Sequence, residues 1–275
     1  MIKHTRREAR DFIIGKRRIF WAQRWILSWA LCVVLCAFLS GCATINPATG
    51  KQEFLILTTP AEVMLGQEVN ASLQGSEKFS KNKADLRRLS RIGQKVVQVS
   101  DRQDYQYQFY LIDKDEMNAF TVPGGHVYFY TGLLRALHSD DEVAAVLAHE
   151  IGHCAAHHVA KKFQMSLGYN IIGSMVFGSI QNELAVRIAK LGADTLMNIG
   201  MSAYSREDEY QADRLGVKYM YLAGFDPNGM ITTFEVLGKA SKGDDNDWML
   251  LRSHPRLSDR IEAVKKEIAV VQTKY

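Results

Sequence analysis

Cysteine is scarce in this chain, which holds four in 275 residues. Three of them, Cys32, Cys36 and Cys42, lie in or next to one apolar segment near the amino terminus. Cys154 is therefore the single cysteine in the rest of the chain, and no disulfide within that part is expected. We interpret Cys154 as a small buried apolar residue, in preference to a metal ligand.

Long apolar runs are also lacking near the amino terminus. The uncharged apolar segment there covers residues 25–39, and this length of about 15 residues is short of the roughly 20 that a transmembrane helix needs. It follows a basic region and suits the core of an export signal. It closes with Leu39-Ser40-Gly41-Cys42, which resembles the bacterial lipobox.

The lipobox predicts that residues 1–41 are a lipoprotein signal peptide and that Cys42 becomes the lipidated first residue of the mature protein. Residue 43 is Ala rather than the Asp that often retains lipoproteins at the inner membrane, which favours the outer membrane. The alternative is an uncleaved signal anchor in the inner membrane.

A basic excess is missing from the remainder of the chain. Residues 1–41 hold eight of the 34 Lys and Arg residues and two of the 30 Asp and Glu residues. The remainder therefore carries 26 basic and 28 acidic residues, so the formal net charge of +4 comes from the amino terminus. Nothing in this balance predicts a nucleic-acid partner.

The most informative stretch reads H-E-x-x-H from His149 to His153, inside a helical run that begins near Asp140. Four residues turn a helix through ~400°, so His149 and His153 share one face and can both reach one Zn²⁺. Glu150 lies ~100° around the helix, where it can take a proton from a water molecule that the metal acidifies. The alternative is a core helix with two hydrogen-bonded histidines, because the motif alone occurs by chance.

Catalytic zinc also needs a third protein ligand and an open position, and the predicted helix from about residue 205 to 222 offers candidates. Glu209 and Asp213 are one turn apart on one face. Glu209 can therefore bind zinc while Asp213 hydrogen-bonds the far nitrogen of a ligand histidine. Glu207 and Asp208 compete for the ligand role, but neither has a carboxylate four residues on. A solvated acidic helix face is the alternative.

Residues 118–130 predict two strands around a Pro-Gly-Gly turn. An exposed strand edge beside the zinc helix can bind an extended peptide by β-augmentation, so Asn118, Ala119 and Gly125 are candidate substrate-binding residues. The alternative is a purely structural hairpin.

Apolar spacing predicts the remaining elements. Helices are expected at residues 60–73 with Thr59 as the cap, 84–99, 131–137, 183–201 and, after a turn at 224–229, up to about residue 240. A last helix after Pro255 is expected to end near residue 271, and strands are expected at 53–58 and 105–112. The uncharged residues 163–182 predict a mobile cover over the cleft or a packed helix rather than a membrane segment.

Two further histidines are candidates for the site. His254 precedes Pro255, which biases it to an extended conformation at the entrance of the last helix. Its neutral imidazole can bind zinc and close the open position, its protonated form can stabilise an oxyanion, or it can merely cap and pack. His157 shares the helix face of His153 but lies another turn away, so we interpret it as structural. A third zinc-binding His at position 159 is excluded, because that residue is Val.

The ordered set of motifs resembles the zinc metallopeptidases that include the CAAX prenyl endopeptidase, HtpX and the periplasmic β-barrel assembly-enhancing protease. The matching stretches are Asn118-Ala119-Phe120, Pro123-Gly124-Gly125, Gly132-Leu133-Leu134, His149-Glu150-x-x-His153, Ser205-Arg206 with Glu209 and Asp213, and His254-Pro255 with Arg260. Residues 46–51 after the lipobox are similar to the exported lipoprotein members.

The resemblance implies a gluzincin with one Zn²⁺ on His149, His153 and Glu209, and with Glu150 as general base. Family descriptions often make the residue that matches Asp213 a proton donor, whereas its spacing favours an orienting role. Both roles stay open.

These observations predict an α+β fold, predominantly helical, with a small edge sheet next to the H-E-x-x-H helix. Residues 42–59 form a lipidated tether with a short strand, and residues 60–275 form the metallopeptidase domain. We expect a periplasmic zinc endopeptidase that is anchored to the membrane through Cys42 and acts on unfolded or misassembled envelope proteins. Self-association is open. The alternative is a zinc-binding chaperone or assembly factor for outer-membrane proteins with little proteolysis.

Overall fold

The computed structural model describes residues 43–168, 194–240, 250, 253–254 and 257–275. The chain divides into a unit of residues 1–44 and a compact unit from Ile45 to Tyr275. The predicted signal peptide and most of the predicted cover at 163–182 lie outside the described residues, so both stay predictions. Among the described residues, no helix combines the length and apolarity that crossing a membrane requires.

Helices dominate the described part of the chain, and the strands are short. The elements are β1 (Ala43–Ile45), β2 (Gln52–Phe54), α2 (Thr59–Ser76), α3 (Lys83–Val99), β3 (Gln108–Ile112), β4 (Ala119–Val122), a 3₁₀ turn (Pro123–Gly125), β5 (His126–Tyr130), α4 (Thr131–Ala136), α5 (Asp140–Ala155), α6 (His158–Leu167), α9 (Arg206–Leu222), α10 (Asn228–Ala240) and α12 (Leu257–Lys274). Residues 194–200 are also helical. The prediction of a mainly helical α+β fold is thereby confirmed.

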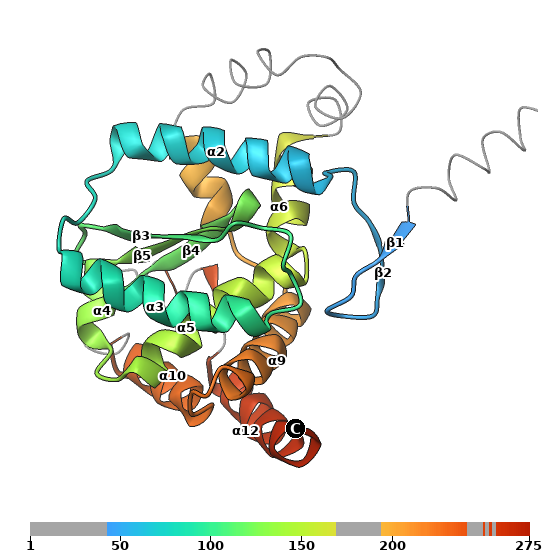
Figure 1. The fold of residues 1–275 in the computed structure, drawn as a ribbon, viewed down its shortest axis with the longest axis vertical. Helices are drawn as coiled ribbons and strands as arrows, with labels where there is room; N and C mark the ends of the chain where they lie inside the picture. The colour runs from blue at the N-terminus through green and yellow to red at the C-terminus, as the bar shows by residue number, and fades with distance from the viewer. Residues whose placement is uncertain (1–42, 169–193, 241–249, 251–252, 255–256) are drawn as a thin grey trace, which may run out of the picture. The chain divides into compact units, whose positions relative to one another are not determined.

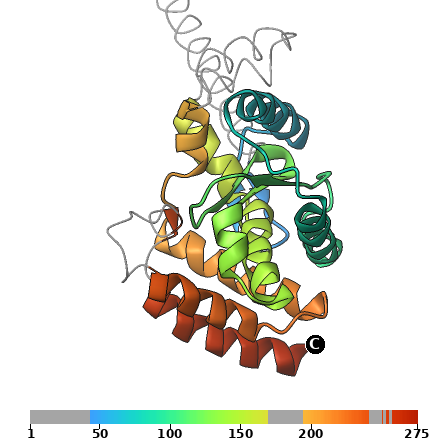
Figure 2. The ribbon, with the colours of Figure 1, turned by 90° about the vertical axis from the view of Figure 1, so that its left-hand side faces the viewer.

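One small sheet lies between helical layers. Its strand order is β3-β5-β4, with β3 and β5 parallel and β4 and β5 antiparallel. Figures 1 and 2 show α2 on one face of the sheet and α3 with α5 on the other, while α9, α10 and α12 lie beyond α5. The predicted hairpin is present, and positive φ angles at Gly124 and Gly125, +79° and +84°, make its Pro-Gly-Gly turn.

The start of α2 differs from the prediction by one residue. The N-cap is Thr58, whose side chain makes no capping hydrogen bond. Thr59 is already helical, and its Oγ1 donates to Asp104 Oδ2 at 2.6 Å instead. Pro60 still lies in the first turn, where its missing N–H costs no helical hydrogen bond.

Residues 46–53 of the predicted tether pack against the end of α5 and the start of α6. The Asn46 side chain is fully buried, and its Nδ2 donates to the backbone oxygen of Ala155 at 3.0 Å. The buried Glu53 carboxylate accepts from Lys161 Nζ at 2.6 Å and contacts His157 Nδ1 at 2.9 Å. This amino-terminal segment is therefore part of the compact unit.

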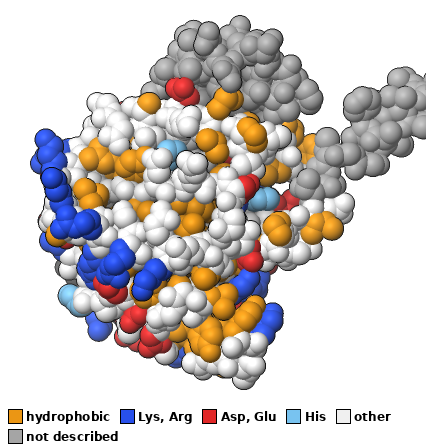
Figure 3. All heavy atoms as spheres, viewed as in Figure 1, with side chains coloured by type: hydrophobic (Ala, Val, Ile, Leu, Met, Phe, Trp, Pro, Cys, Tyr) orange, Lys and Arg blue, Asp and Glu red, His pale blue; other side chains and the backbone are white. Residues whose placement is uncertain are grey.

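The helix α3 packs against α5 and also contacts α9. On the face drawn in Figure 3, basic side chains gather along the edge where α3 lies, and the centre of the face carries little charge. Arg88 and Arg91 of α3 pair with the carboxylate of Asp140 at 2.8 and 2.6 Å. These ion pairs connect α3 to the first turn of α5.

The most extensive contact between two helices of the described residues joins α5 to α9, and it depends on glycine in both helices. A Cβ atom at Gly152 of α5 would lie 2.8 Å from the backbone oxygen of Ala212. A Cβ atom at Gly216 of α9 would lie 3.3 Å from the backbone nitrogen of His149. Neither helix can hold a larger residue there without moving, so these glycines bring the two backbones together at the H-E-x-x-H motif.

We predict that Gly152→Ala destabilises the protein by about 1–2 kcal/mol. Alanine favours the helix by about 0.5–1 kcal/mol, but the added methyl meets backbone that can yield only if the helices separate, which costs about 1–3 kcal/mol. Gly75→Ala in α2 is the matched control, since no atom lies within 4 Å of a Cβ there, and it should stabilise the protein slightly. Chemical denaturation measures both changes. Equal stability of the two variants would contradict a tight crossing.

Candidate metal centre

The helix that carries the central motif begins with a complete capping box. Ser139 Oγ accepts from the backbone N–H of Glu142 at 3.1 Å, and Glu142 Oε2 accepts from that of Ser139 at 3.3 Å. The apolar residues of α5 face the core, and the three motif side chains are buried, with His149 7% exposed, Glu150 1% and His153 0%. The predicted helix from Asp140 is therefore present, with the three polar residues of its motif inside the protein.

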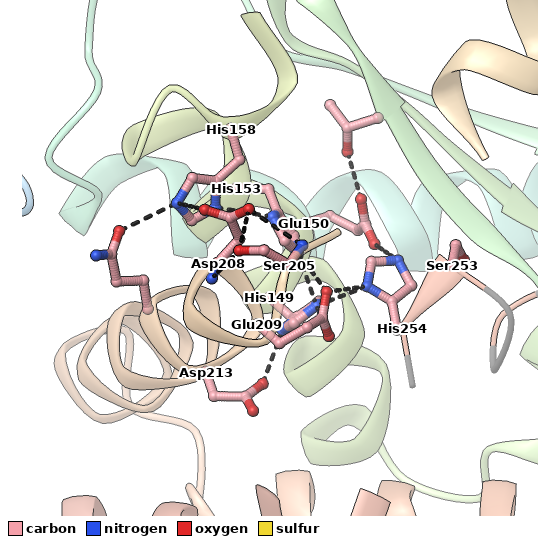
Figure 4. A network of polar contacts seen from close by, with 12 residues as sticks. His149, Glu150, His153, His158, Ser205, Asp208, Glu209, Asp213, Ser253 and His254 are labelled. Carbon is pink, nitrogen blue, oxygen red and sulfur yellow. Dashed lines mark hydrogen bonds and ion pairs between the residues drawn. The ribbon is translucent and has the colours of Figure 1, made fainter. Parts of the chain in front are cut away.

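Four side chains converge beside α5. His149 Nε2 and His153 Nε2 are 3.0 Å apart, and Glu209 Oε1 lies 3.4 Å from His153 Nε2. His254 Nδ1 lies 3.2 Å from His149 Nε2 and 2.8 Å from Glu209 Oε1. One ligand atom from each of the four lies within 4.8 Å of every other, and all four residues are buried (Figure 4).

The chemistry of these donors fits a zinc ion. Zinc binds imidazole nitrogen and carboxylate oxygen in four-coordinate sites, whereas calcium and magnesium prefer oxygen ligands throughout. The second carboxylate oxygen of Glu209 accepts no well-aligned hydrogen bond from the described residues, although Arg260 Nη1 lies 2.6 Å from it. A buried group of three imidazoles and one carboxylate can therefore bind a cation through atoms that already face one another.

A carboxylate contacts the ring of His149 at Nδ1, the nitrogen that faces away from the other ligand atoms. Its Nδ1 lies 2.8 Å from Asp213 Oδ1, so Nε2 faces the cluster. Arg260 of α12 binds Asp213 through two hydrogen bonds of 2.7 Å. Burial raises the pKa of Asp213, but the ion pair with Arg260 outweighs it, and the net pKa lies below the ordinary value. Asp213 thus lies where an orienting residue would lie, on the side of His149 away from the other ligand atoms.

Of the neighbouring acidic residues of α9, Glu209 is the one that reaches the cluster. Burial raises its pKa, but the charges of His254 and Arg260 outweigh burial and hold the pKa of this carboxyl below its ordinary value. Glu207 is exposed and pairs with Lys51 at 3.0 Å. Asp208 completes the capping box of α9 with Ser205 and lies outside the ligand group, although it contacts a histidine described below. The competing candidates therefore have other partners.

Glu150 lies beside the ligand cluster and not within it. Its Oε2 accepts from Thr121 Oγ1 of β4 at 2.8 Å. Its Oε1 accepts no hydrogen bond from the described residues, and His254 Nε2 lies 3.4 Å away. One oxygen is thus anchored to the sheet while the other faces the site. Thr121 was not among the residues that the sequence singled out, because nothing in its local pattern marks it.

The three candidate substrate-binding residues lie on or near the edge strand β4. Asn118 and Ala119 at the start of β4 are fully buried, and Asn118 Nδ2 contacts Met201 Sδ at 3.3 Å. Gly125 lies at the turn, and a Cβ atom there would be 3.1 Å from Tyr105. The described contacts of these residues are with the core, and their substrate role stays a prediction.

His157 does not continue the face of His153, because α5 ends at Ala155 and His157 has a left-handed backbone with φ of 59°. The expectation that it lies one further turn along the same helix is wrong. A left-handed conformation costs a non-glycine residue about 1–2 kcal/mol, which the surrounding contacts have to offset. Its Nδ1 contacts Glu53, outside the ligand group, which agrees with a structural interpretation.

Sequence spacing missed two residues that contact His153. His158 Nδ1 lies 3.0 Å from His153 Nδ1, although five residues along a continuous helix would place the two side chains about 140° apart. Tyr204 stacks on the His153 ring with centroids 3.8 Å apart, and Lys162 Nζ lies 3.2 Å above the Tyr204 ring. In the sequence, Arg260 was noted only as part of the resemblance. It lies on α12, distant in sequence from the motif, and it binds Asp213.

Comparison with known proteins agrees with this geometry. The sequence profile of peptidase family M48 matches residues 83–268. The chain belongs to peptidase family M48. That membership confirms the resemblance to zinc metallopeptidases that the motifs indicated, and it supports the expectation of a metalloendopeptidase.

Several curated proteins of this kind are similar to the chain. The β-barrel assembly-enhancing protease of Escherichia coli is 28% identical over 222 residues, which cover 78% of this chain and 45% of that protein. The metalloprotease LoiP of the same species is 29% identical over 191 residues, covering 68% and 72%. The mitochondrial metalloendopeptidase OMA1 of Schizosaccharomyces pombe is 29% identical over 187 residues, covering 68% and 54%. The chain thus spans about half the length of the first of these relatives.

Proposed function

We propose that this chain is a zinc-dependent endopeptidase of the gluzincin type, with one Zn²⁺ on His149, His153 and Glu209. The observation that carries the proposal is the convergence of buried ligand atoms within 4.8 Å beside the carboxylate of Glu150. Membership of peptidase family M48 supports peptide-bond hydrolysis as the reaction. The neighbouring edge strand β4 supports an extended polypeptide as substrate, with Asn118 and Ala119 at its start.

The roles of the chain's own residues follow from their contacts. A bound zinc ion would acidify a water molecule and polarise the peptide carbonyl. Glu150 accepts the proton of the attacking water at Oε1, because Thr121 already occupies Oε2. Asp213 accepts the Nδ1 proton of His149 and so directs Nε2 of that ring toward the metal position. Arg260 keeps both Asp213 and Glu209 in place.

Substitution of the acidic residues separates these roles. Glu150→Gln should keep one equivalent of zinc and lower the rate of casein cleavage by about 10²–10⁴-fold, because the general base is lost while the ligands remain. Glu209→Ala should lose the metal, since it removes a ligand. Glu207→Ala is the matched control, as its exposed side chain pairs with Lys51 and lies outside the ligand group, and it should still bind one equivalent of zinc and cleave casein. Elemental analysis and a casein assay measure these outcomes.

Other results would assign the residues differently. Loss of zinc from Glu150→Gln would make Glu150 a ligand, and loss from Glu207→Ala alone would move the third ligand. A wild-type protein that binds zinc and unfolded casein without cleaving it would favour the zinc-binding chaperone or assembly factor over the peptidase.

We further propose that His254 closes the site in its resting state. Its Nδ1 lies among the ligand atoms, and its Nε2 lies 3.4 Å from Glu150 Oε1, where an attacking water would have to bind. A histidine at this place occupies the position that a catalytic zinc site keeps open.

The closure proposal predicts that His254→Ala raises the basal rate of casein cleavage several-fold, with zinc retained on the other three ligands. A fall in turnover with full zinc content would instead support oxyanion stabilisation by His254. Rates and zinc content equal to wild type would leave only a packing role. Initial rates and metal content, measured on the same preparations, distinguish these outcomes.

We also propose that the protein acts in the bacterial periplasm, anchored to the outer membrane through lipid on Cys42, on unfolded or misassembled envelope proteins. The lipobox and the preceding basic and apolar segments support the anchor. The relative named for β-barrel assembly supports a substrate class within the envelope.

The anchor has its own test in cells. Wild-type protein should fractionate with the outer membrane and have the mass of a lipidated chain that begins at Cys42. Cys42→Ala should yield a longer or unacylated species, because the thiol that accepts the lipid is gone. Intact-mass data that show residues 1–41 still present in the wild type would refute the lipobox interpretation in favour of a signal anchor.

A further inference from the structure

The two ligand histidines of α5 are held in different ways. His149 Nδ1 lies 2.8 Å from the carboxylate of Asp213. The Nδ1 atom of His153 contacts no carboxylate of the described residues and instead faces a second imidazole, His158, at 3.0 Å between the two Nδ1 atoms. Both rings of this pair are buried, with His153 fully buried and His158 3% exposed.

The protonation of His153 follows from its place in the cluster. Its Nε2 lies 3.0 Å from His149 Nε2 and 3.4 Å from Glu209 Oε1, so Nε2 is the nitrogen that faces the metal position. A ligand imidazole binds zinc through a nitrogen without a proton, so the Nδ1 atom of His153 carries the N–H. That N–H needs an acceptor, and the neighbouring His158 Nδ1 is the atom placed to accept it.

His158 can accept only if its own proton is on Nε2. That atom lies 3.1 Å from Gln211 Oε1 and 3.2 Å from Asp208 Oδ1, two acceptors on α9. The amide of Gln211 is oriented because its Nε2 donates to Glu207 at 3.3 Å, which leaves Oε1 toward His158. The Asp208 carboxylate is fixed by Ser205, whose Oγ donates to it at 2.7 Å. The hydrogen bonds from His153 to His158 and from His158 to α9 therefore share one direction, in which each donor is on the His153 side.

The hydrogen bond between His153 and His158 depends on the break between α5 and α6. His157 has φ of 59°, and the turn it makes after α5 brings His158 back against His153, with ring centroids 5.1 Å apart. A strained residue next to a buried polar network indicates a functional constraint. The acceptors lie on the helix that also supplies Glu209, so the network connects both ligand-bearing helices (Figure 4).

We propose that His158 is a positioning residue for the metal centre. It accepts a hydrogen bond from Nδ1–H of His153, and its own Nε2–H is held by Gln211 and Asp208. The inference rests on the zinc site proposed above. His158 fixes the tautomer and the ring orientation of His153, a function that Asp213 performs for His149.

Zinc affinity tests this role without any activity assay. His158→Phe retains a ring but offers no acceptor, and it should weaken zinc binding by about 10- to 100-fold in competition with a chromophoric chelator. His158→Gln offers an amide oxygen to His153 and an amide N–H₂ to Asp208, so it should bind zinc within a few-fold of wild type. His157→Asn is the matched control, because asparagine tolerates a left-handed backbone and the residue contacts no ligand; its affinity should be unchanged. Circular dichroism verifies the fold of each variant.

A spectroscopic readout separates positioning from general packing. In the zinc-loaded wild type, ¹⁵N spectra of the imidazoles should show a slowly exchanging Nδ1–H on His153, and this signal should be lost or exchange rapidly in His158→Phe. Affinity of folded His158→Phe within threefold of wild type would overturn the proposal, as would equal losses in His158→Phe and His158→Gln.

A variant at the α9 end of the hydrogen-bond network provides a second test if His158→Phe does not fold. Gln211→Met should weaken zinc binding by about 3- to 10-fold, and an unchanged affinity would overturn the proposal. The endopeptidase proposal and the His158 proposal are refuted by different results. A wild type that binds zinc but does not cleave casein refutes the endopeptidase and leaves the affinity comparison valid, whereas a wild type that binds no zinc refutes both.

Discussion

The close crossing of α5 and α9 is the constraint on which the rest of the site depends. One helix supplies His149 and His153 and the other supplies Glu209, so the spacing of the two backbones sets the distance between the ligand atoms. Zinc binds these atom types at about 2.0–2.2 Å and tolerates little error. Glycines at positions 152 and 216 permit the approach, and the capping boxes at Ser139 and Ser205 fix where each helix begins.

The buried charges around this crossing define geometry more than they add stability. Arg260 is 3% exposed and binds the carboxylates of both Asp213 and Glu209. Removing charged groups from water costs several kcal/mol for each ion, so such a network is weak support for stability in itself. It joins α12 to α9 and leaves one guanidinium facing two carboxylates. A divalent cation at the cluster would supply the positive charge that this balance lacks.

Local features of the sequence predicted the local parts of the site. The capping signals and apolar spacing gave the start of α5 and both ends of α9 to within a residue, and the Pro-Gly-Gly turn gave the β4–β5 hairpin. The end of α5 was missed, because the helix was expected to continue through His157. The approach of Glu209 to the H-E-x-x-H motif also followed from spacing, because both groups of candidate ligands lie on regular helices. The start of α2 was predicted one residue late, since the Thr59 hydroxyl found a partner in Asp104 across the fold.

Contacts that depend on breaks in helices or on distant segments could not be predicted in this way. His158 reaches His153 only because His157 adopts a left-handed backbone, and no residue pattern there requires it, as glycine is absent. Arg260 and Thr121 come from elements far along the chain whose packing the periodicity of α5 does not define. The same holds for Asn46, which lies in a stretch that reads as a turn.

The early end of α5 explains why a segment outside the family match packs against the helix that carries the H-E-x-x-H motif. A helix that stops inside the protein leaves its last carbonyl groups without helical partners, and burying them unpaired is costly. Arg102 Nη1 donates to the oxygen of Cys154 at 3.2 Å, and Asn46 Nδ2 donates to that of Ala155 at 3.0 Å. The match to peptidase family M48 begins at residue 83, after Asn46. The amino-terminal segment therefore pairs the last carbonyl group of the helix that carries the H-E-x-x-H motif, just before the break at His157, with a residue from outside the matched region.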